Sequence, residues 1–274
     1  MRRARVVQVH PSLWCNLACA HCYSSSGPAA KAALDPALVT GLLQDAAGQG
    51  YDAIAVSGGE PLLYKGLHEV IAAARDLGMR TSLTTNAMPV TRRAAGQLRG
   101  IDLVAVSVDG PPESHNASRG SDRAFPLMHR GVGYLRESGI PFGMLFMLTQ
   151  HNVNELDWVA CFAVREGAAL LQIHPLELAG RASGRTDTPD SIEMSWALIE
   201  ALRLRRDYKD RLHVHLDAAP AARLTELELF GADEDAELSR LVPTIVLEAD
   251  GTVVPVQHGF PRRFAFGDLH TESF

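Results

Sequence analysis

The sequence is poor in cysteine, in aromatic residues and in long apolar runs. It has four cysteines and 6% aromatic residues in 274 residues. So few cysteines do not make a disulfide-stapled scaffold. No apolar stretch approaches the length of a membrane-spanning helix, and the apolar run near the N-terminus is too short for a secretory signal. We therefore expect a cytoplasmic protein with reduced thiols and no membrane partner.

Positive charge is also in deficit. The chain has 26 Lys and Arg against 32 Asp and Glu, a net charge of -6. Recognition of nucleic acid needs a basic surface, so we expect no nucleic-acid partner. Hydrophobic residues are abundant at 46%, and the length suits one large domain or two small ones. A well-packed core is expected.

Short apolar runs alternate with longer helical patterns. We expect strands at 6–10, 53–57, 81–85, 103–107, 142–148 and 170–174, and helices at 35–48, 67–77, 91–98, 124–137 and 154–165. Strands that are apolar throughout predict a parallel sheet covered by helices. Six such units indicate an α/β fold, either a partial or closed barrel or a doubly wound sheet. In each case the chemistry belongs at the C-terminal ends of the strands.

The pattern weakens after residue 185. A helix at 190–207, a further strand at 213–216, an acidic surface segment at 226–240 and a hairpin at 244–256 are expected, the last with Asp250 and Gly251 at its turn. We therefore predict a β/α core at 1–185 and a C-terminal extension at 186–274. The basic segment 203–211 is either a solvated helix face or a binding surface for an acidic peptide.

Three of the four cysteines lie within eight residues, directly after the first expected strand. Cys15, Cys19 and Cys22 have the spacing C-x3-C-x2-C. A structural zinc site closes with four ligands, to which His21 could contribute, but C-x3-C is an uncommon zinc knuckle. An iron–sulfur cubane usually takes four thiolates. Three thiolates on four irons would leave one iron open to a cofactor or substrate.

Two further motifs follow the second and third expected strands. In SGGEP, the pair Gly58 and Gly59 would let the backbone approach a ligand closely, and the Glu60 carboxylate could accept hydrogen bonds from an ammonium group. The alternative is a tight turn with a surface glutamate. Asn86 ends the third strand, where it could line a pocket or serve as a polar turn residue.

The fourth expected strand ends in SVDG. Ser107 and Asp109 lie two residues apart, so in an extended strand they face the same side, and their hydroxyl and carboxylate suit a ribose diol. Arg119 follows in SRG, and its guanidinium fork suits a carboxylate. The alternative for Arg119 is a solvated loop residue.

Together these motifs resemble the radical S-adenosylmethionine (radical SAM) superfamily. The resemblance covers residues 5–185 and implies a partial (β/α)6 TIM-like barrel with a short C-terminal extension that contains a β-hairpin. It implies one [4Fe-4S] cluster and SAM, whose reductive cleavage yields a 5′-deoxyadenosyl radical that abstracts hydrogen from a substrate. A ferredoxin or flavodoxin is the implied electron donor. The implied metal ligands are Cys15, Cys19 and Cys22, and the implied SAM-binding residues are Tyr23, Gly58, Gly59, Glu60, Asn86, Ser107, Asp109 and Arg119.

SVDG, SRG and the GRA at 180–182 resemble the peptide-modifying (SPASM or twitch) branch of that family. The tail resembles the start of that branch's cysteine-rich extension, here truncated, with Val256 at an expected cysteine. With only Cys161 left over, we expect no auxiliary cluster. Cys161 is expected to pack structurally rather than donate hydrogen, and His174 to be a satisfied histidine. The expected substrate is a ribosomally made peptide; the alternatives are a small molecule of natural-product or cofactor biosynthesis, and a non-catalytic metal-binding protein.

Overall fold

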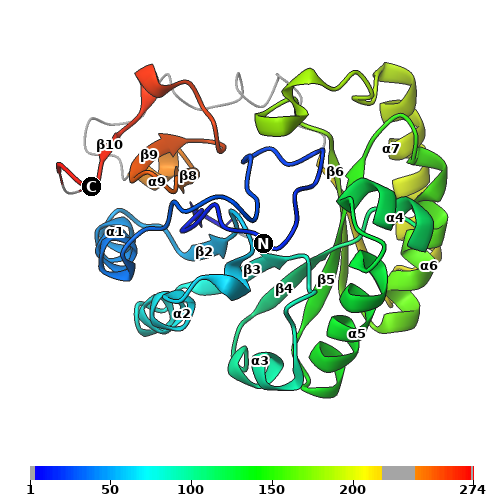
Figure 1. Cartoon of the computed structure of the whole chain (residues 1–274), viewed down its shortest axis with the longest axis horizontal. Helices are drawn as coiled ribbons and strands as arrows, with labels where there is room; N and C mark the ends of the chain where they lie inside the picture. Colours follow the sequence, from blue (N-terminus) through cyan, green and yellow to red (C-terminus); the bar gives the residue numbers. More distant parts are fainter. Residues whose placement is uncertain (1–3, 218–237, 273) are drawn as a thin grey trace. The chain divides into compact units, whose positions relative to one another are not determined.

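The computed structural model describes residues 4–217, 238–272 and 274 (Figure 1). The chain divides into two compact units. The first unit comprises Met1–Cys15, Ala29–Leu83 and Ala219–Phe274, and the second unit comprises Asn16–Pro28 and Thr84–Ala218. The predicted boundary at residue 185 is a different division and stays a prediction. No helix among the described residues is long and apolar enough to cross a membrane.

The first unit holds the N-terminal strands together with the C-terminal hairpin. Its strands are β1 (Val6–Val9), β2 (Ala53–Val56), β3 (Arg80–Thr85), β8 (Thr244–Leu247), β9 (Thr252–Pro255) and β10 (Gly267–Asp268). β1 pairs in parallel with both β2 and β8, while β9 pairs antiparallel with β8 and β10. The helical segments are α1 (Pro36–Gly48), η1 (Pro61–Leu63), α2 (Leu67–Asp76), α9 (Leu238–Leu241) and η4 (Arg262–Phe264). The predicted hairpin is confirmed.

The second unit is built on parallel strands. They are β4 (Leu103–Ser107), β5 (Phe142–Leu148), β6 (Leu170–Pro175) and β7 (His213–Leu216), paired in that order. The helical segments are α3 (Arg92–Gln97), α4 (Pro112–Arg119), α5 (Ala124–Glu137), η2 (Val153–Glu155), α6 (Leu156–Glu166), η3 (Gly180–Gly184) and α7 (Ser191–Asp207). Helices α5, α6 and α7 lie side by side along the strands (Figure 1). Met144, Phe146 and Phe162 are fully buried in the core between them.

Local sequence explains where these elements begin. Asp35 caps α1 by accepting a hydrogen bond from the Ala37 amide at 2.9 Å, and Pro36 occupies the first turn. Asp190 and Glu193 form a reciprocal capping box at the start of α7. The predicted α/β fold with a parallel sheet is confirmed. Among the described strands the sheet is open, because its strand order runs from β10 to β7 without closing on itself. The predicted acidic segment 226–240 lies mostly outside the described residues.

Candidate active site

In the first unit, the chain that leaves β1 lies against the Gly-Gly turn after β2. The Gly59 amide donates to the Ser12 carbonyl at 2.7 Å, and the Glu60 amide donates to the Trp14 carbonyl at 2.9 Å. A Cβ atom on Gly59 would lie 2.1 Å from the Trp14 oxygen. Gly58 has a φ of 101°, which favours glycine. The glycines therefore make room for the backbone that leads into Cys15, a close approach that we had expected to serve a ligand.

Glu60 is buried and not a surface residue. Its exposed fraction is 2%, and its carboxylate accepts a hydrogen bond from the Leu62 amide at 3.2 Å as the cap of η1. The alternative of a turn with a surface glutamate is therefore wrong. Burying a carboxylate is costly unless it is hydrogen-bonded, which is typical of a residue with a specific partner. Its role toward SAM stays a prediction.

In the second unit, residues 16–28 form a segment that we name the cysteine loop. Cys19 is buried in it and Cys22 is half-buried. The Cys22 Sγ lies 3.4 Å from the Ser24 Oγ. None of the four cysteines of the chain takes part in a disulfide bond in this structure. Cys15 precedes the loop and belongs to the first unit.

A buried ion pair joins the end of β4 to α4. The Arg119 Nε donates to Oδ2 of Asp109 at 2.6 Å, and an Arg119 Nη donates to Oδ1 at 3.0 Å. The side chains of Asp109 and Arg119 are 1% and 11% exposed. Burial alone would raise the pKa of Asp109, but the guanidinium holds that pKa well below its usual range. Arg119 is the last residue of a helix, so the alternative of a solvated loop arginine is wrong.

This pairing alters the expected roles of Asp109 and Arg119. Each of the two predicted SAM contacts, to the ribose and to the carboxylate, comes from a side chain that already has a protein partner. Ser118 also donates to the Asp109 carboxylate, at 3.1 Å. A ligand at this place would therefore add to a formed network or displace part of it. The two SAM contacts stay predictions.

The same ion pair lies beside a predicted metal ligand. Burial raises the pKa of the Cys19 thiol, and the nearby Arg119 guanidinium opposes this by favouring the thiolate. Burial lowers the pKa of His21 to about 4, so its ring is neutral at pH 7. The His21 Nδ1 is hydrogen-bonded to the Ser118 Oγ at 3.0 Å. That nitrogen therefore already has a partner within the protein.

The fit of the cysteines to a cluster can be judged from their chemistry. Two reduced thiols lie in one short loop, one of them with a cation to favour the thiolate, and a third precedes the loop by one residue. These are the ligand type and number that an open-iron cubane takes. Among the described residues no three His, Cys, Asp or Glu side chains are gathered to hold a metal ion. The residues fit the cluster chemically, and the ligand assignment stays a prediction.

The remaining predicted residues also lie in the second unit. Asn86 is buried, and its side-chain amide donates to Asn16 Oδ1 at 2.9 Å, which ties the end of β3 to the cysteine loop. Tyr23 is half-buried in the loop, and Ser107 is buried at the end of β4. A cavity of about 400 Å³ lies beside the loop, with Asn16, Leu17, Met88 and Arg123 among its lining residues.

Sequence reasoning missed several residues of this network. The His115 Nδ1 accepts from the Asp109 amide at 3.1 Å, and burial lowers the pKa of His115 to about 4. Ser114 donates to Glu155, whose pKa is raised by burial. His115 and Ser114 come from α4, a helix that the sequence analysis does not predict. Pro112 and Glu113 in its first turn were the available signal.

Two single residues can be placed directly. Cys161 is exposed on α6, so the expected structural packing is wrong, although its position on a helix is as predicted. His174 lies between Asp217 and Glu177 at 3.1 and 3.2 Å. Burial alone would lower its pKa, but the two carboxylates raise the pKa to about 9. His174 is thus a satisfied histidine at the end of β6.

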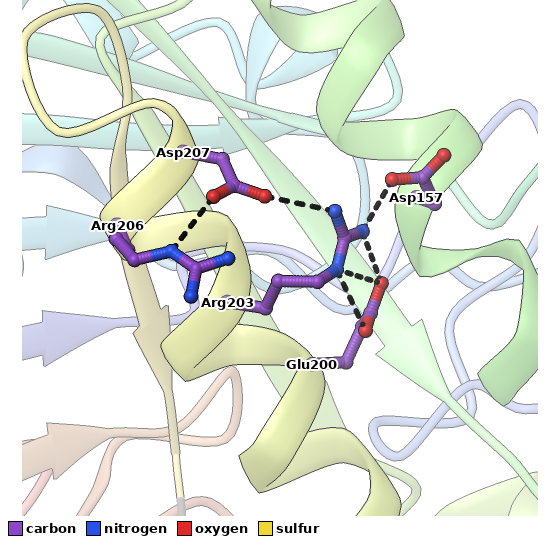
Figure 2. A network of polar contacts seen from close by, with 5 residues as sticks. All are labelled: Asp157, Glu200, Arg203, Arg206 and Asp207. Carbon is purple, nitrogen blue, oxygen red and sulfur yellow. Dashed lines mark hydrogen bonds and ion pairs between the residues drawn. The ribbon is translucent and has the colours of Figure 1, made fainter.

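The basic segment 203–211 carries charges that are largely paired where it belongs to α7. Figure 2 shows Arg203 between Asp157, Glu200 and Asp207, with Arg206 on the other side of Asp207. Arg203 is 37% exposed, and exposed pairs of this kind contribute little stability one by one. These two arginines are therefore not available as unpaired cations for an acidic peptide.

The fold and the motifs define an α/β protein with a cysteine loop after its first strand and ligand-type residues after the next strands. The model of the Radical SAM superfamily matches residues 9–162, which is more than half of the chain. The chain belongs to this superfamily. The cofactors of the family are a [4Fe-4S] cluster and SAM, as predicted.

Similar curated proteins include synthases named for coproporphyrin and heme, and a maturation protein. The Fe-coproporphyrin III synthase of Methanosarcina barkeri is 33% identical over 77% of this chain and 52% of its own length. The AdoMet-dependent heme synthase of Nitratidesulfovibrio vulgaris is 31% identical over 76% and 57%. The sporulation killing factor maturation protein SkfB of Bacillus subtilis is 26% identical over 73% and 49%. The chain therefore spans about half the length of these relatives.

Among solved structures, SuiB of Streptococcus suis bound to S-adenosylmethionine superposes with a TM-score of 0.75. The match covers 94% of this chain and 61% of SuiB at 14% identity. At that identity the likeness concerns the fold alone. It agrees with the predicted fold class, the partial α/β barrel of radical SAM proteins.

Proposed function

We propose that the chain carries the catalytic core of a radical SAM enzyme that acts on a small molecule, and that this molecule is a tetrapyrrole with carboxylate side chains. The observation that carries the substrate class is the identity of 33% and 31% to proteins named for coproporphyrin and heme synthesis. The proposed cluster ligands are Cys15, Cys19 and Cys22. We retain a cytoplasmic location and a ferredoxin or flavodoxin as electron donor within the proposal.

The chain's own residues have distinct parts in this mechanism. The bound cluster and SAM supply the 5′-deoxyadenosyl radical. Arg119 favours the thiolate form of Cys19, since a cation beside a thiol stabilises its anion. Glu60, held as a cap at the end of β2, offers a carboxylate for the SAM amino group. Tyr23, Gly58, Gly59, Asn86, Ser107 and Asp109 complete the proposed SAM-binding set.

Modification of a ribosomally made peptide remains the second candidate. It is supported by the 26% identity to SkfB, a maturation protein, and by the fold of SuiB, which has also been solved with its precursor peptide SuiA. We rank it second because the identities to the tetrapyrrole enzymes are higher. An extension at residues 186–274 that carries no cysteine, and the division at residue 185, remain part of the proposal.

Anaerobic reconstitution with iron and sulfide tests the cofactor. The protein should turn brown and hold about four irons, and with dithionite and SAM it should release 5′-deoxyadenosine. Cys15→Ala should abolish both the colour and the product. Cys161→Ala is the matched control and should change neither, because Cys161 is exposed on α6. A colourless protein that retains zinc would contradict the radical proposal.

Binding of substrate is tested separately with iron coproporphyrin III as the probe. A saturable shift of its Soret band on titration with the reconstituted protein supports the tetrapyrrole. A peptide of unrelated sequence and matched charge, added as a competitor, should leave that shift unchanged. A protein that cleaves SAM but leaves the Soret band unshifted would overturn the substrate class and leave the cofactor assignment standing.

A further inference from the structure

The GRA segment at residues 180–182 lies directly against the cysteine loop, although about 160 residues separate them in sequence. We propose that Arg181 is a positioning residue that holds the cysteine loop in the conformation that receives the cluster. The proposal rests on the cluster assignment above. It assigns to η3, which follows β6 in the chain, a part in building the cluster site, in addition to any contact with SAM.

Arg181 binds the loop at three backbone carbonyls. Its Nε donates to the Cys19 carbonyl at 3.0 Å, and its own amide donates to the Cys22 carbonyl at 3.0 Å. A terminal nitrogen of the same guanidinium donates to the Ser26 carbonyl. The planar fork thus reaches the loop near its middle and near its end at once. Hydrogen bonds to a charged donor are roughly twice as strong as neutral ones.

Gly180 and Ala182 explain why small residues flank this arginine. Gly180 has a φ of 55°, and a Cβ atom there would lie 2.2 Å from the Tyr23 carbonyl oxygen and 2.7 Å from that of Cys22. No side chain fits at that distance, so only glycine allows η3 to lie on the loop. Ala182 is fully buried beneath the turn. Gly180 and Arg181 therefore both serve the close contact with the loop.

The charge of Arg181 points in the same direction. Within the part of the chain that the structure describes, its side chain donates to carbonyl oxygens and pairs with no carboxylate. Because its acceptors are neutral carbonyl oxygens of the loop, no carboxylate offsets the positive charge of this half-buried guanidinium. A cubane held by three thiolates is an anionic group, which this cation would stabilise. Arg185, four residues later, has its own partner in Asp187 and serves as a contrast.

Three variants test the proposal: Arg181→Gln, Arg181→Lys and the control Arg185→Gln. Hydrogen–deuterium exchange of the cluster-free proteins reports on residues 16–28 without any need for the cluster. After reconstitution, the loss of iron to a chelator is followed by the absorbance of the cluster, and its rate reports on cluster stability. Circular dichroism melting shows that each variant is folded. None of these readouts is enzymatic activity.

In Arg181→Gln we expect at least tenfold faster exchange in the cysteine loop and at least tenfold faster iron loss, with Arg185→Gln like the wild type. Arg181→Lys should show the same faster exchange, because an ammonium cannot span Cys19 and Ser26, but it should lose iron more slowly than Arg181→Gln, because it keeps the positive charge. Unchanged exchange and iron loss in Arg181→Gln would overturn the proposal, and a lysine variant with wild-type behaviour would overturn the bidentate positioning. A wild-type protein that takes up no cluster would instead contradict the proposed function.

Discussion

The buried pair of Asp109 and Arg119 gives the sharpest stability prediction. Arg119→Met removes the cation and leaves a carboxylate that is 1% exposed. Loss of one partner from a buried pair costs about 3–5 kcal/mol, because the remaining charge is uncompensated. We expect the lower end, about 3 kcal/mol, since Ser118 still donates a hydrogen bond to Asp109. The matched control is Arg80→Met, whose pair with Asp52 is about half exposed and should cost under about 1 kcal/mol.

The pH dependence of the loss follows from the pKa of Asp109. In the wild type this pKa lies below the unfolded value of 3.8, so the pair stabilises above that pH and its contribution is lost in stronger acid. In Arg119→Met, burial without a cation raises the pKa above 3.8. The variant therefore regains stability relative to the wild type as the pH falls from 7.5 to 5. In the wild type, burial lowers the pKa values of His21 and His115 to about 4, so both rings are neutral in this window. The Arg119 cation helps to lower both pKa values, so its loss in Arg119→Met raises them.

Urea unfolding of the cluster-free proteins, followed by far-ultraviolet circular dichroism at pH 5, 6 and 7.5, measures both effects. Hydrogen exchange in β4 and α4 assigns the loss to the second unit. The double variant Asp109→Asn/Arg119→Met should recover part of the stability at pH 7.5, because the buried charge is gone. A loss for Arg119→Met that equals that of Arg80→Met, or one that is constant with pH, would refute the reasoning.

Two further predictions concern the turn after β2 and the end of β6. Gly59→Ala should lower the free energy of unfolding by about 2 kcal/mol or more, because its Cβ would lie 2.1 Å from the Trp14 carbonyl oxygen. The control Gly41→Ala, in the middle of α1 where no atom lies within 4 Å, should instead raise it by about 0.5–1 kcal/mol. Equal melting temperatures for the two variants would contradict the contact. Asp217→Asn should lower the pKa of His174 from about 9 and cost about 1 kcal/mol at pH 6. That cost should fade as the pH rises through 9, where the wild-type imidazolium loses its proton; a His174 pKa that NMR titration finds unchanged would count against the assigned pair.

Elements with a strong local signal could be predicted from the sequence. The helix at 124–137 and the strands at 103–107 and 142–148 agree with the structure to the residue. Each has a continuous apolar strand pattern or a helical periodicity. The start of α1 is signalled by two adjacent residues, Asp35 as the N-cap and Pro36 in the first turn. The motifs at the strand ends could be placed for the same reason, because they directly follow these runs.

Helix α4 could not be predicted in this way. It has eight residues, and His115 is its only buried one among those described. The helix has no apolar face, so the sequence shows no hydrophobic periodicity that would predict it. Its position is fixed instead by Arg119 and Ser118, which bind the buried Asp109. Arg119, for which a solvated loop residue was the alternative, ends this helix and anchors it to Asp109. The same tertiary contact keeps Asp109 ionised by lowering its pKa, and it places the Arg119 cation where it partly offsets the rise that burial causes in the pKa of Cys19.

The cysteine loop shows why the motif alone says little about its own conformation. Its spacing indicates a metal, yet the residues that hold the loop come from the ends of β3 and β6: Asn86 binds Asn16 across 70 residues, and Arg181 binds Cys19 across 162. Because these contacts use protein atoms only, they do not need the cluster. The loop should therefore be ordered before iron arrives, and cluster assembly should then cost less conformational entropy than closing a flexible loop of the same length.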